Sequence, residues 1–382
     1  MSTINSKIKV MTILGTRPEI IRLSRVMAML DQYTDHCIVH TGQNYDYELN
    51  GIFFNDLGVR KPDFFLEVNT SSLGNFLGDT LKKTEEVIDR VKPDAVLILG
   101  DTNSSIAGII AKRKKIPIYH MEAGNRCFDL NVPEEINRRI IDHIADFNLV
   151  YTEHARRHLI AEGIPQRRIY LTGSPMYEVL KHYSDGIQKS EILKKLDLQD
   201  GKYFVVSTHR EENVDNKENL KIILRTLNGL AEQHGLPVIV STHPRTRKRL
   251  ADLEGLKLSG KVQFLDPFGF FDYVHLQQKA CCTLSDSGTI SEESAILNFP
   301  AVTVRNAIER PEALDAGTIV LTGLDETTIL RSVDMVVSDL SSRKYPGIPD
   351  EYQVEDTSMR VVRLIMGTSK LSNQWHGIVK NG

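Results

Sequence analysis

Three carboxylate side chains in the first half of the chain stand where they could carry proton transfers. Asp101 and Glu122 each follow a short apolar run, and Glu134 follows Pro133 at the start of an amphipathic stretch. The carboxyl ends of parallel strands meet at one edge of a sheet, and ligand sites of open α/β sheets form there. Carboxylates gathered at such an edge suit general acid–base catalysis. Each also has a structural alternative, because Asp101 could cap a helix and Glu134 could complement a helix dipole.

The turn Gly15–Glu19 has the features of an anion site. It directly follows the first apolar run and opens a helix, with Pro18 in the first helical turn. N–H groups at a helix N-terminus attract phosphate, and Arg17 and Arg22 would add positive charge. The spacing is not Gly-x-Gly-x-x-Gly, so it does not indicate a dinucleotide cofactor. An ordinary strand-to-helix turn with surface arginines is the alternative.

A second turn, Ser285–Glu293, ends another apolar run and opens another helix. Thr289 and Glu292 fit a capping box. The N–H groups expected to face a phosphate belong to Ser287, Gly288 and Thr289. Glu293, one turn inside the helix, could accept both hydroxyls of a ribose. A well-capped helix without a ligand is the alternative.

Further charged side chains follow other apolar runs of the second half. His209 and Arg210 come directly after Tyr203–Ser207, and Arg310 lies beyond Ala301–Val304. A histidine at a strand end can exchange a proton near neutral pH. Arg310 could neutralise a diphosphate. A satisfied structural histidine and a lone surface arginine are the alternatives.

Apolar runs alternate with amphipathic stretches along the chain, which predicts parallel sheets covered by helices. Strands are expected at Lys9–Leu14, Cys37–His40, Ala95–Leu99, Pro117–Met121, Phe147–Tyr151, Tyr203–Ser207, Val238–Ser241, Val262–Leu265, Cys282–Ser285 and Ala301–Val304. Helices are expected at Leu73–Arg90, Leu220–His234 and Met359–Met366, and the polar end Lys370–Gly382 is expected to fray. Two series of similar size predict two Rossmann-like, doubly wound α/β domains, residues 1–172 and 173–357, joined through Gly173–Asp200.

The composition excludes several classes of function. The chain has 382 residues and a net charge of -3, so no global positive field is available to hold nucleic acid or an anionic membrane. The basic runs Lys112–Lys115 and Arg245–Arg249 indicate solvated helix faces. The four cysteines lack metal-ligand spacing, and no apolar run approaches the ~20 residues of a membrane span. The N-terminus has no signal-peptide pattern, so we expect a cytoplasmic protein.

Taken together and in order, these motifs resemble the non-hydrolysing UDP-N-acetylglucosamine 2-epimerase family. The matching motifs are Gly15–Glu19, Gly100–Thr102, Glu122–Gly124, Pro133–Arg138, His209–Arg210, Ser285–Glu293 and Glu309–Glu312. The resemblance implies a glycosyltransferase-B fold, with a cleft between two Rossmann-like domains and the final helix, residues 358–382, returning to the N-terminal domain. It also implies a homodimer that binds a UDP-sugar and UDP and needs no cofactor.

The roles of the family's residues carry over by position. The acid–base candidates are Asp101, Glu122, Glu134 and His209. The implied substrate contacts are Arg17, Arg22, His209, Phe268, Tyr273, Ser287, Gly288, Thr289, Glu293 and Arg310. Arg22 replaces a lysine that the family often has, and Phe268 replaces a glutamine near the uracil in familiar members. Some members are activated by their own substrate, and Gln43, Arg210 and His243 are the candidates for such a regulatory site.

The implied reaction inverts C2 of a UDP-N-acetylamino sugar through elimination of UDP, a 2-acetamidoglycal and re-addition of UDP. A finer likeness lies in Thr41–Asp46, Glu122–Asp129 and Ser287–Glu293, which are similar to the branch that makes UDP-N-acetyl-L-fucosamine. That branch converts UDP-2-acetamido-2,6-dideoxy-L-talose for capsule or O-antigen. Conversion of UDP-N-acetylglucosamine to UDP-N-acetylmannosamine is the alternative. A UDP-sugar glycosyltransferase, a hydrolysing epimerase and a catalytically silent sensor are the competing functions.

Overall fold

The structure, a computed structural model, describes residues 7–42, 54, 56–251, 258–339 and 347–378. The chain divides into two compact units: unit 1 comprises Met1–His182 and Glu351–Gly382, and unit 2 comprises Tyr183–Asp350. The sequence placed the boundaries at residues 172/173 and 357/358 instead. The difference arises because Gly173 packs against the returning chain, where a Cβ would lie 2.4 Å from the Val354 side chain.

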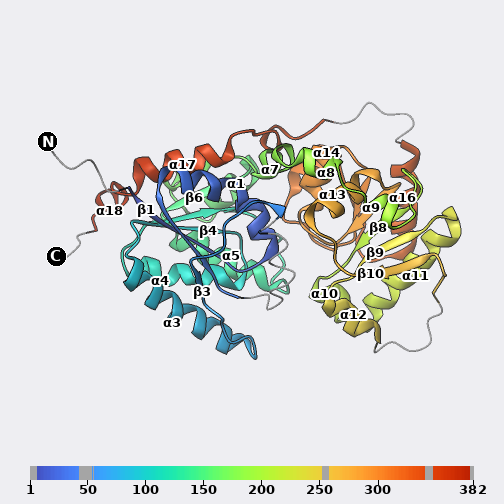
Figure 1. The fold of residues 1–382 in the computed structure, drawn as a ribbon, viewed down its shortest axis with the longest axis horizontal. Helices are drawn as coiled ribbons and strands as arrows, with labels where there is room; N and C mark the ends of the chain where they lie inside the picture. The colour runs from blue at the N-terminus through green and yellow to red at the C-terminus, as the bar shows by residue number, and fades with distance from the viewer. Residues whose placement is uncertain (1–6, 43–53, 55, 252–257, 340–346, 379–382) are drawn as a thin grey trace. The chain divides into compact units, whose positions relative to one another are not determined.

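Unit 1 is built on a parallel sheet whose described strands run in the order β3-β2-β1-β4-β5-β6-β7 (Figure 1). The strands are β1 (Lys9–Leu14), β2 (Asp35–His40), β3 (Phe64–Phe65), β4 (Ala95–Leu99), β5 (Ile118–Met121), β6 (Phe147–Val150) and β7 (Ile169–Leu171). The helices are α1 (Arg17–Tyr33), α3 (Leu73–Val91), η1 (Asn103–Ala107), α4 (Gly108–Arg113), α5 (Pro133–Ile144), α6 (Glu153–Ala161), η2 (Gln166–Arg168), α7 (Met176–His182), η3 (Asp350–Tyr352), α17 (Thr357–Thr368) and α18 (Ser372–Trp375).

Helices cover this sheet in two layers. Apolar side chains of α3, α4 and α5 share a buried core with β1, β2, β4 and β5, and α1 packs with α7 and α17 in the other layer. Helix α1 forms here because Ile20, Leu23, Met27 and Leu30 recur at helical spacing and are all buried. The first and last parts of the chain are therefore packed together in unit 1, as the resemblance implied for the final helix.

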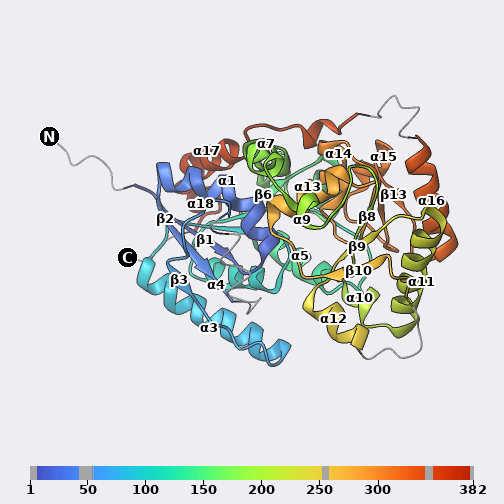
Figure 2. The ribbon, with the colours of Figure 1, turned by 45° about the vertical axis from the view of Figure 1, so that its right-hand side comes forward.

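Unit 2 repeats the architecture with the described strand order β10-β9-β8-β11-β12-β13, again parallel (Figure 2). Its strands are β8 (Phe204–Ser207), β9 (Val238–Ser241), β10 (Val262–Leu265), β11 (Cys282–Ser285), β12 (Ala301–Thr303) and β13 (Val320–Leu321). Its helices are α8 (Ser184–Gln188), α9 (Ile192–Lys195), α10 (Glu211–Val214), α11 (Lys217–His234), α12 (Pro244–Ala251), α13 (Phe270–Lys279), α14 (Ile290–Leu297), α15 (Pro311–Asp315) and α16 (Glu326–Asp339). Helices α11 and α16 share a core with β8, β9, β11 and β12.

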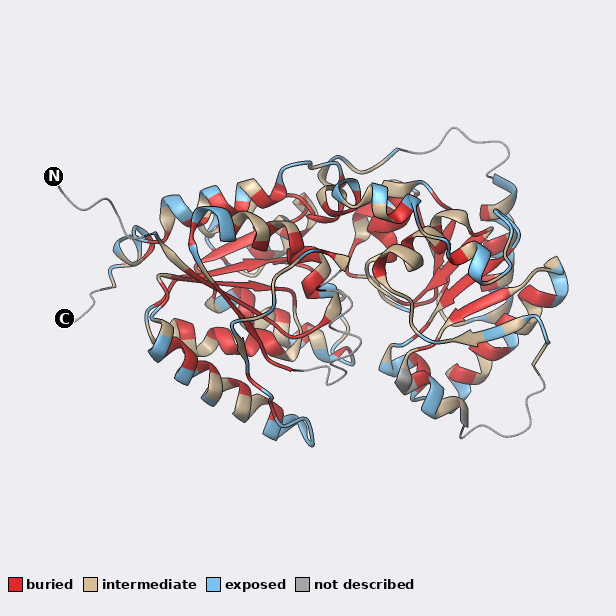
Figure 3. Cartoon of the chain, viewed as in Figure 1, coloured by how far each residue is buried: buried red, intermediate tan, exposed pale blue. Residues whose placement is uncertain are grey.

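The predicted fold class is confirmed, since both sheets are parallel and doubly wound. The central strands β4, β5 and β11 are buried along their whole length, whereas the edge strands β3, β10 and β13 are only partly buried (Figure 3). The expectation that Lys370–Gly382 frays was wrong for its first part, because α18 forms there. Ser372 is buried, and the Trp375 ring lies 6.3 Å from that of Phe147, measured between centroids. No helix among the described residues is long and apolar enough to cross a membrane.

In each sheet the winding reverses at one point, and crevices for ligands form at the carboxyl ends of the strands there. In unit 1 this topological switch point lies between β1 and β4, and in unit 2 between β8 and β11. The segments that follow these four strands are Gly15–Glu19, Gly100–Thr102, Thr208–Arg210 and Asp286–Thr289. The winding of both sheets thus places the sequence motifs at the edges where ligand sites form.

Candidate active site

In unit 1, Asp101 is held in place by helix α5. The Arg138 guanidinium donates to Asp101 Oδ2 from Nε at 2.9 Å and from Nη2 at 2.5 Å. The Asn137 side-chain amide donates to the Asp101 main-chain oxygen at 3.0 Å. The Asp101 side chain remains 24% exposed. Its carboxylate is therefore fixed in orientation and still open to a ligand.

Glu122 lies beside Asp101 at the end of the neighbouring strand. A Cβ built on Gly100 would be 3.7 Å from Glu122 Oε2. The backbone of Glu122 is left-handed, with a φ of 65°. Residues other than glycine seldom adopt this conformation, and those that do are enriched at functional sites. Its carboxylate is paired with the buried guanidinium of Arg22. Arg22, expected to contact the substrate, thus acts in unit 1 as the ion-pair partner of Glu122.

Glu134 and Glu135 begin α5 but differ in their surroundings. Glu135 is buried and accepts hydrogen bonds from Arg138 Nη1 at 2.9 Å and from the Cys127 N–H at 3.1 Å. Glu134 is partly exposed and lies one helical turn before Asn137 and Arg138, which both bind Asp101. Glu135 is therefore structural. Asp101 and Glu122 follow neighbouring strands of unit 1, and Glu134 begins the helix that holds Asp101; these three residues are here called the acidic set.

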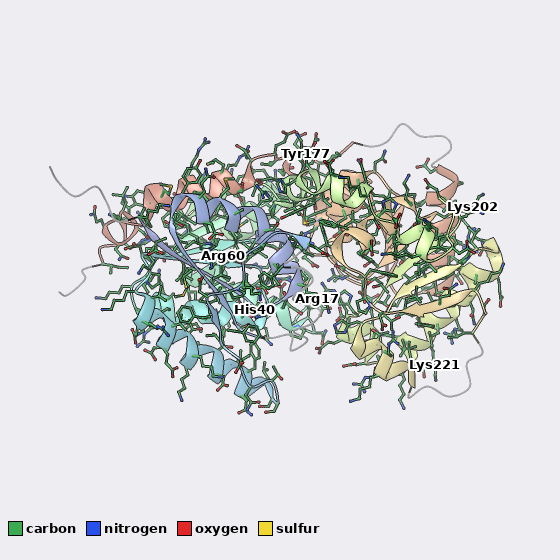
Figure 4. The ribbon with its side chains drawn as sticks, in the orientation of Figure 1. Arg17, His40, Arg60, Tyr177, Lys202 and Lys221 are labelled. Atoms are coloured by element: carbon green, nitrogen blue, oxygen red, sulfur yellow. The ribbon has the colours of Figure 1, made fainter. Side chains whose placement is uncertain are left out.

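The turn Gly15–Glu19 differs from the expectation. The N–H groups of Gly15 and Thr16 donate to Glu19 Oε2 at 2.9 and 2.7 Å, and the Thr16 hydroxyl donates to the same oxygen at 2.8 Å. The expected phosphate donors of this turn are thus taken by the protein's own carboxylate. What the turn presents is Arg17, the partly exposed first residue of α1 (Figure 4).

In unit 2, Asp286 organises the switch point. It is fully buried and accepts from the N–H groups of His209 and Arg210, both at 3.0 Å to Oδ2, and from the Asn213 side-chain amide at 2.9 Å. His209 Nδ1 lies 3.3 Å from Asp286 Oδ1, and 43% of the His209 side chain is exposed. Asp286 therefore fixes the histidine's backbone and leaves the imidazole open to a ligand. Arg210 Nε in turn donates to the Asp286 main-chain oxygen at 2.9 Å.

The residues Ser287–Thr289, here called the phosphate turn after the contact expected of them, are built without the expected capping box. Thr289 has helical backbone angles, and its side chain makes no cap hydrogen bond. Its hydroxyl lies 3.0 Å from that of Ser287, and the Ser287 N–H donates to Ser285 Oγ at 3.0 Å. The capping-box prediction was wrong because the hydroxyls of this turn pair with one another.

Gly288 permits close contact between the phosphate turn and Arg310. A Cβ there would lie 2.4 Å from Glu309 Oε1 and 2.8 Å from Arg310 Nη1. Arg310 is buried, with Nε 3.6 Å from the Glu292 carboxylate. The alternative of a lone surface arginine does not hold, because Arg310 is built into the interior beside the phosphate turn.

The expected uridine contacts also gather near this switch point. Glu293 is buried and accepts from the Gln277 side-chain amide at 2.9 Å. The Tyr273 hydroxyl bonds to Ser207 and Ser285, and burial together with the Glu293 charge raises the pKa of Tyr273. Phe268 is half-buried and packs with Tyr273 on the core that covers this face of the sheet.

Two of the three expected regulatory residues lie beside His209. The imidazole rings of His209 and His243 have centroids 6.2 Å apart, and Arg210 Nη2 lies 3.4 Å from Glu309 Oε1. Gln43 lies outside the described residues.

Four residues that hold the site in place were not predicted from the sequence: Glu19, Arg138, Asp286 and Gln277. For Asp286 the signal was a polar residue at the end of a strand. The other three act through side-chain contacts between elements, which the sequence does not indicate.

With this geometry in view, comparison with known proteins is decisive. A family model described as UDP-N-acetylglucosamine 2-epimerase matches residues 28–366. The chain belongs to this family. The family resemblance drawn from the motifs is therefore confirmed, and the chain is an isomerase.

Solved and curated relatives cover nearly the whole chain. UDP-N-acetylglucosamine 2-epimerase from Rickettsia bellii is 49% identical, with a TM-score of 0.91 and coverage of 97% of this chain and 100% of its own. The Methanocaldococcus jannaschii epimerase in complex with UDP-GlcNAc and UDP is 34% identical, with a TM-score of 0.88 and coverage of 94% and 100%. UDP-2,3-diacetamido-2,3-dideoxy-D-glucuronate 2-epimerase of Pseudomonas aeruginosa is 37% identical over 329 residues, 85% of this chain and 91% of that protein.

Proposed function

We propose that this epimerase inverts C2 of a UDP-N-acetylamino sugar by eliminating UDP and adding it back. The observation that carries the proposal is the pair of held carboxylates in unit 1, Asp101 on Arg138 and Glu122 on Arg22, within a family whose Methanocaldococcus jannaschii member was solved with UDP-GlcNAc and UDP. A nucleotide-binding unit alone would serve several enzyme classes. Proton exchange at C2 requires carboxylates in addition, and unit 1 supplies them.

Unit 2 would hold UDP. Arg310 and the phosphate turn would bind the diphosphate, with Arg17 of unit 1 as a further cation. Preorganised charges of this kind stabilise a leaving group as its charge develops. Glu293, oriented by Gln277, would accept the ribose hydroxyls, and Tyr273 and Phe268 would flank the uracil.

The acidic set would move the C2 proton. C2 of an acetamido sugar is not next to a carbonyl carbon, so a base cannot simply remove and return its proton. In the proposed step the C2–H bond and the C1–O bond to UDP break together, and the C2–H electron pair forms the C1–C2 double bond of a 2-acetamidoglycal. UDP then forms the C1–O bond again while a proton reaches the opposite face of C2. Two proton-carrying groups are needed, and Asp101, Glu122, Glu134 and His209 are the candidates.

For the sugar, we propose UDP-2-acetamido-2,6-dideoxy-L-talose, which would yield UDP-N-acetyl-L-fucosamine for capsule or O-antigen. Support comes from the motifs Glu122–Asp129 and Ser287–Glu293. Phe128, which is 68% exposed in the loop between Glu122 and Glu134, would offer an apolar contact to a 6-methyl group. Such a contact is worth about 0.8 kcal/mol per buried carbon.

UDP-N-acetylglucosamine is the second candidate, favoured by the names of the Rickettsia bellii and Methanocaldococcus jannaschii proteins. The Pseudomonas aeruginosa relative, at 37% identity, is named for another sugar, so identity at this level is compatible with either. The test offers the two sugar nucleotides separately and follows conversion by NMR. Turnover of the 6-deoxy-L-talo compound alone supports the proposal, and turnover of UDP-N-acetylglucosamine alone replaces it with the second candidate.

Two further expectations remain proposals. Arg210 and His243 would belong to a second substrate site that activates the enzyme, so the variant H243A should lose sigmoidal rate dependence but keep turnover. The enzyme would also form a homodimer, which light scattering on the purified protein measures. Hyperbolic kinetics in the wild type, or a monomeric mass, would remove the corresponding proposal.

A further inference from the structure

Glu19 is a buried carboxylate that the proposed chemistry does not use. It is 2% exposed and begins α1 beside Arg17. Oε2 accepts three hydrogen bonds from Gly15 and Thr16, and Oε1 accepts a fourth from the Thr102 hydroxyl at 3.1 Å. All four described donors are neutral groups. A carboxylate held away from water in this way has a specific structural task, because burying its charge is costly.

The fourth hydrogen bond joins the two strands that meet at the switch point. Glu19 lies in the turn after β1, and Thr102 lies in the turn after β4, directly next to Asp101. The Thr102 hydroxyl also accepts from the Ser104 N–H at 3.3 Å, which caps η1. One side chain thus connects the turn that carries Arg17 to the turn that carries Asp101.

We propose that Glu19 is a positioning residue of the epimerase reaction, whose carboxylate locks the Arg17 turn to the Asp101 turn through Thr102. The inference rests on the proposed function, in which Arg17 binds the diphosphate and Asp101 acts at C2. Elimination breaks bonds at C1 and C2 together, so the cation at the leaving group and the acid–base group must keep a fixed separation. Misplacement by about 1 Å can cost on the order of 100-fold in rate.

The ionisation of Glu19 gives this lock a pH signature. Burial raises the pKa of Glu19 to about 7, and hydrogen bonds from Gly15, Thr16 and Thr102 oppose the rise. Three donors already point at Oε2, so a proton would go to Oε1, reverse the bond to Thr102 and remove the charge-assisted hold on the turn. The lock is therefore strongest in the ionised form, above pH 7.

Other charged groups on the neighbouring elements are already engaged. Helix α1 carries Arg17 and Arg22, the latter paired with Glu122 from the end of β5. The end of β4 carries Asp101, which is paired with Arg138. These groups are present in both the wild type and a Glu19 variant, so the ratio of the two proteins' rates isolates the change at Glu19.

The test compares E19Q, T102V and T102S with the wild type, using deuterium exchange at C2 of whichever of the two sugar nucleotides is converted. E19Q imitates the protonated carboxyl, T102V removes the bridging hydroxyl, and T102S retains it. The matched control is T34V, which deletes a buried hydroxyl bond to the Leu30 main-chain oxygen at the opposite end of the same helix. Circular dichroism checks that each variant is folded.

We expect kcat at pH 8 to fall on the order of tenfold in E19Q and T102V, with T102S and T34V close to wild type. The double variant E19Q/T102V should lose no more than either single variant, because both break one connection. The ratio of wild-type to E19Q kcat should shrink toward one below pH 6. If E19Q does not fold, T102V against T102S makes the same comparison.

If the wild type is active and the kcat values of E19Q and T102V lie within about twofold of its value, the inference about Glu19 is overturned while the proposed function stands. A rate ratio that stays constant from pH 6 to pH 8 would do the same, because a purely structural defect has no reason to follow the ionisation of Glu19. Wild-type enzyme that exchanges neither sugar nucleotide would instead overturn the proposed function, and this inference with it.

Discussion

The same buried carboxylate makes a prediction about stability whose sign is opposite to that for activity. Glu19 has its pKa raised from 4.5 to about 7 in the folded protein. Its contribution to stability is therefore fully present below pH 4.5, where it is protonated in both states, and is lost as pH rises through 7. Each unit of pKa difference between the folded and unfolded protein corresponds to about 1.4 kcal/mol, so ionised Glu19 costs about 3 kcal/mol of folding free energy at pH 8.

The perturbation is E19Q, which cannot ionise. We expect its free energy of unfolding to increase, relative to that of the wild type, by about 2–3 kcal/mol between pH 5 and pH 8. Every other titrating group is common to the two proteins and cancels in the comparison. E19Q should therefore be the more stable and the less active protein at pH 8.

Urea unfolding followed by tryptophan fluorescence suits this measurement. The chain has one tryptophan, Trp375, and it belongs to α18 of unit 1, the unit that also contains Glu19. The signal thus reports unfolding of the relevant unit. T34V again serves as the control and should differ from wild type by the same amount at both pH values. The reasoning is refuted if the difference in free energy of unfolding between E19Q and wild type does not change with pH, or if the wild type becomes more stable relative to E19Q as pH rises.

Three other predictions follow from the site. G288A should weaken UDP binding by at least about tenfold in calorimetry, because the new Cβ would meet Glu309 at 2.4 Å and Arg310 at 2.8 Å. The control G260A, where nothing lies within 4 Å of the new Cβ, should bind UDP as the wild type does. Equal affinities of G288A and wild type would show that the phosphate turn does not contact UDP. D101N and E122Q should each lose on the order of 100-fold or more in turnover while keeping UDP affinity, and full activity in both would sink the acid–base assignment. W375A should lower the stability of unit 1 by about 1 kcal/mol in urea unfolding followed by circular dichroism, since the ring is half-exposed; an unchanged midpoint would mean that α18 adds nothing.

Long buried strands were predictable, and short edge strands were not. The expected strands Lys9–Leu14 and Ala95–Leu99 match β1 and β4 residue for residue, because central parallel strands are apolar on both faces. The strands without a sequence prediction are β3, β7 and β13, which have two or three residues and lie at the ends of the sheets. They pair on one side only, so they need no long apolar run.

The same capping pattern had two outcomes in this chain. Thr16 and Glu19 fit it as well as Thr289 and Glu292, yet reciprocal hydrogen bonding occurs only at Thr16. There the backbone is extended, with a φ of −135°, as an N-cap requires. Thr289 already has helical angles and Glu292 lies near Arg310. Local spacing cannot distinguish the two, because the surrounding packing decides which way each side chain turns.

For the site, the sequence predicted positions better than partners. Asp101 and Glu122 could be placed because they end strands. Their pairing with Arg138 and Arg22 could not, since a guanidinium on a helix can reach several strand ends and only the packed structure selects one. The same reason hid Glu19, whose hydrogen bond to Thr102 crosses between two strands of the sheet.

The central claim is that the acidic set exchanges the C2 proton of a UDP-N-acetylamino sugar. The most direct measurement incubates the enzyme in deuterated water with each of the two sugar nucleotides and no acceptor, and reads C2 by NMR. The account predicts the C2 epimer with UDP still attached and deuterium at C2, and no exchange in D101N. Unchanged protium at C2 in both sugar nucleotides, or free UDP with a released sugar as the end product, would contradict it.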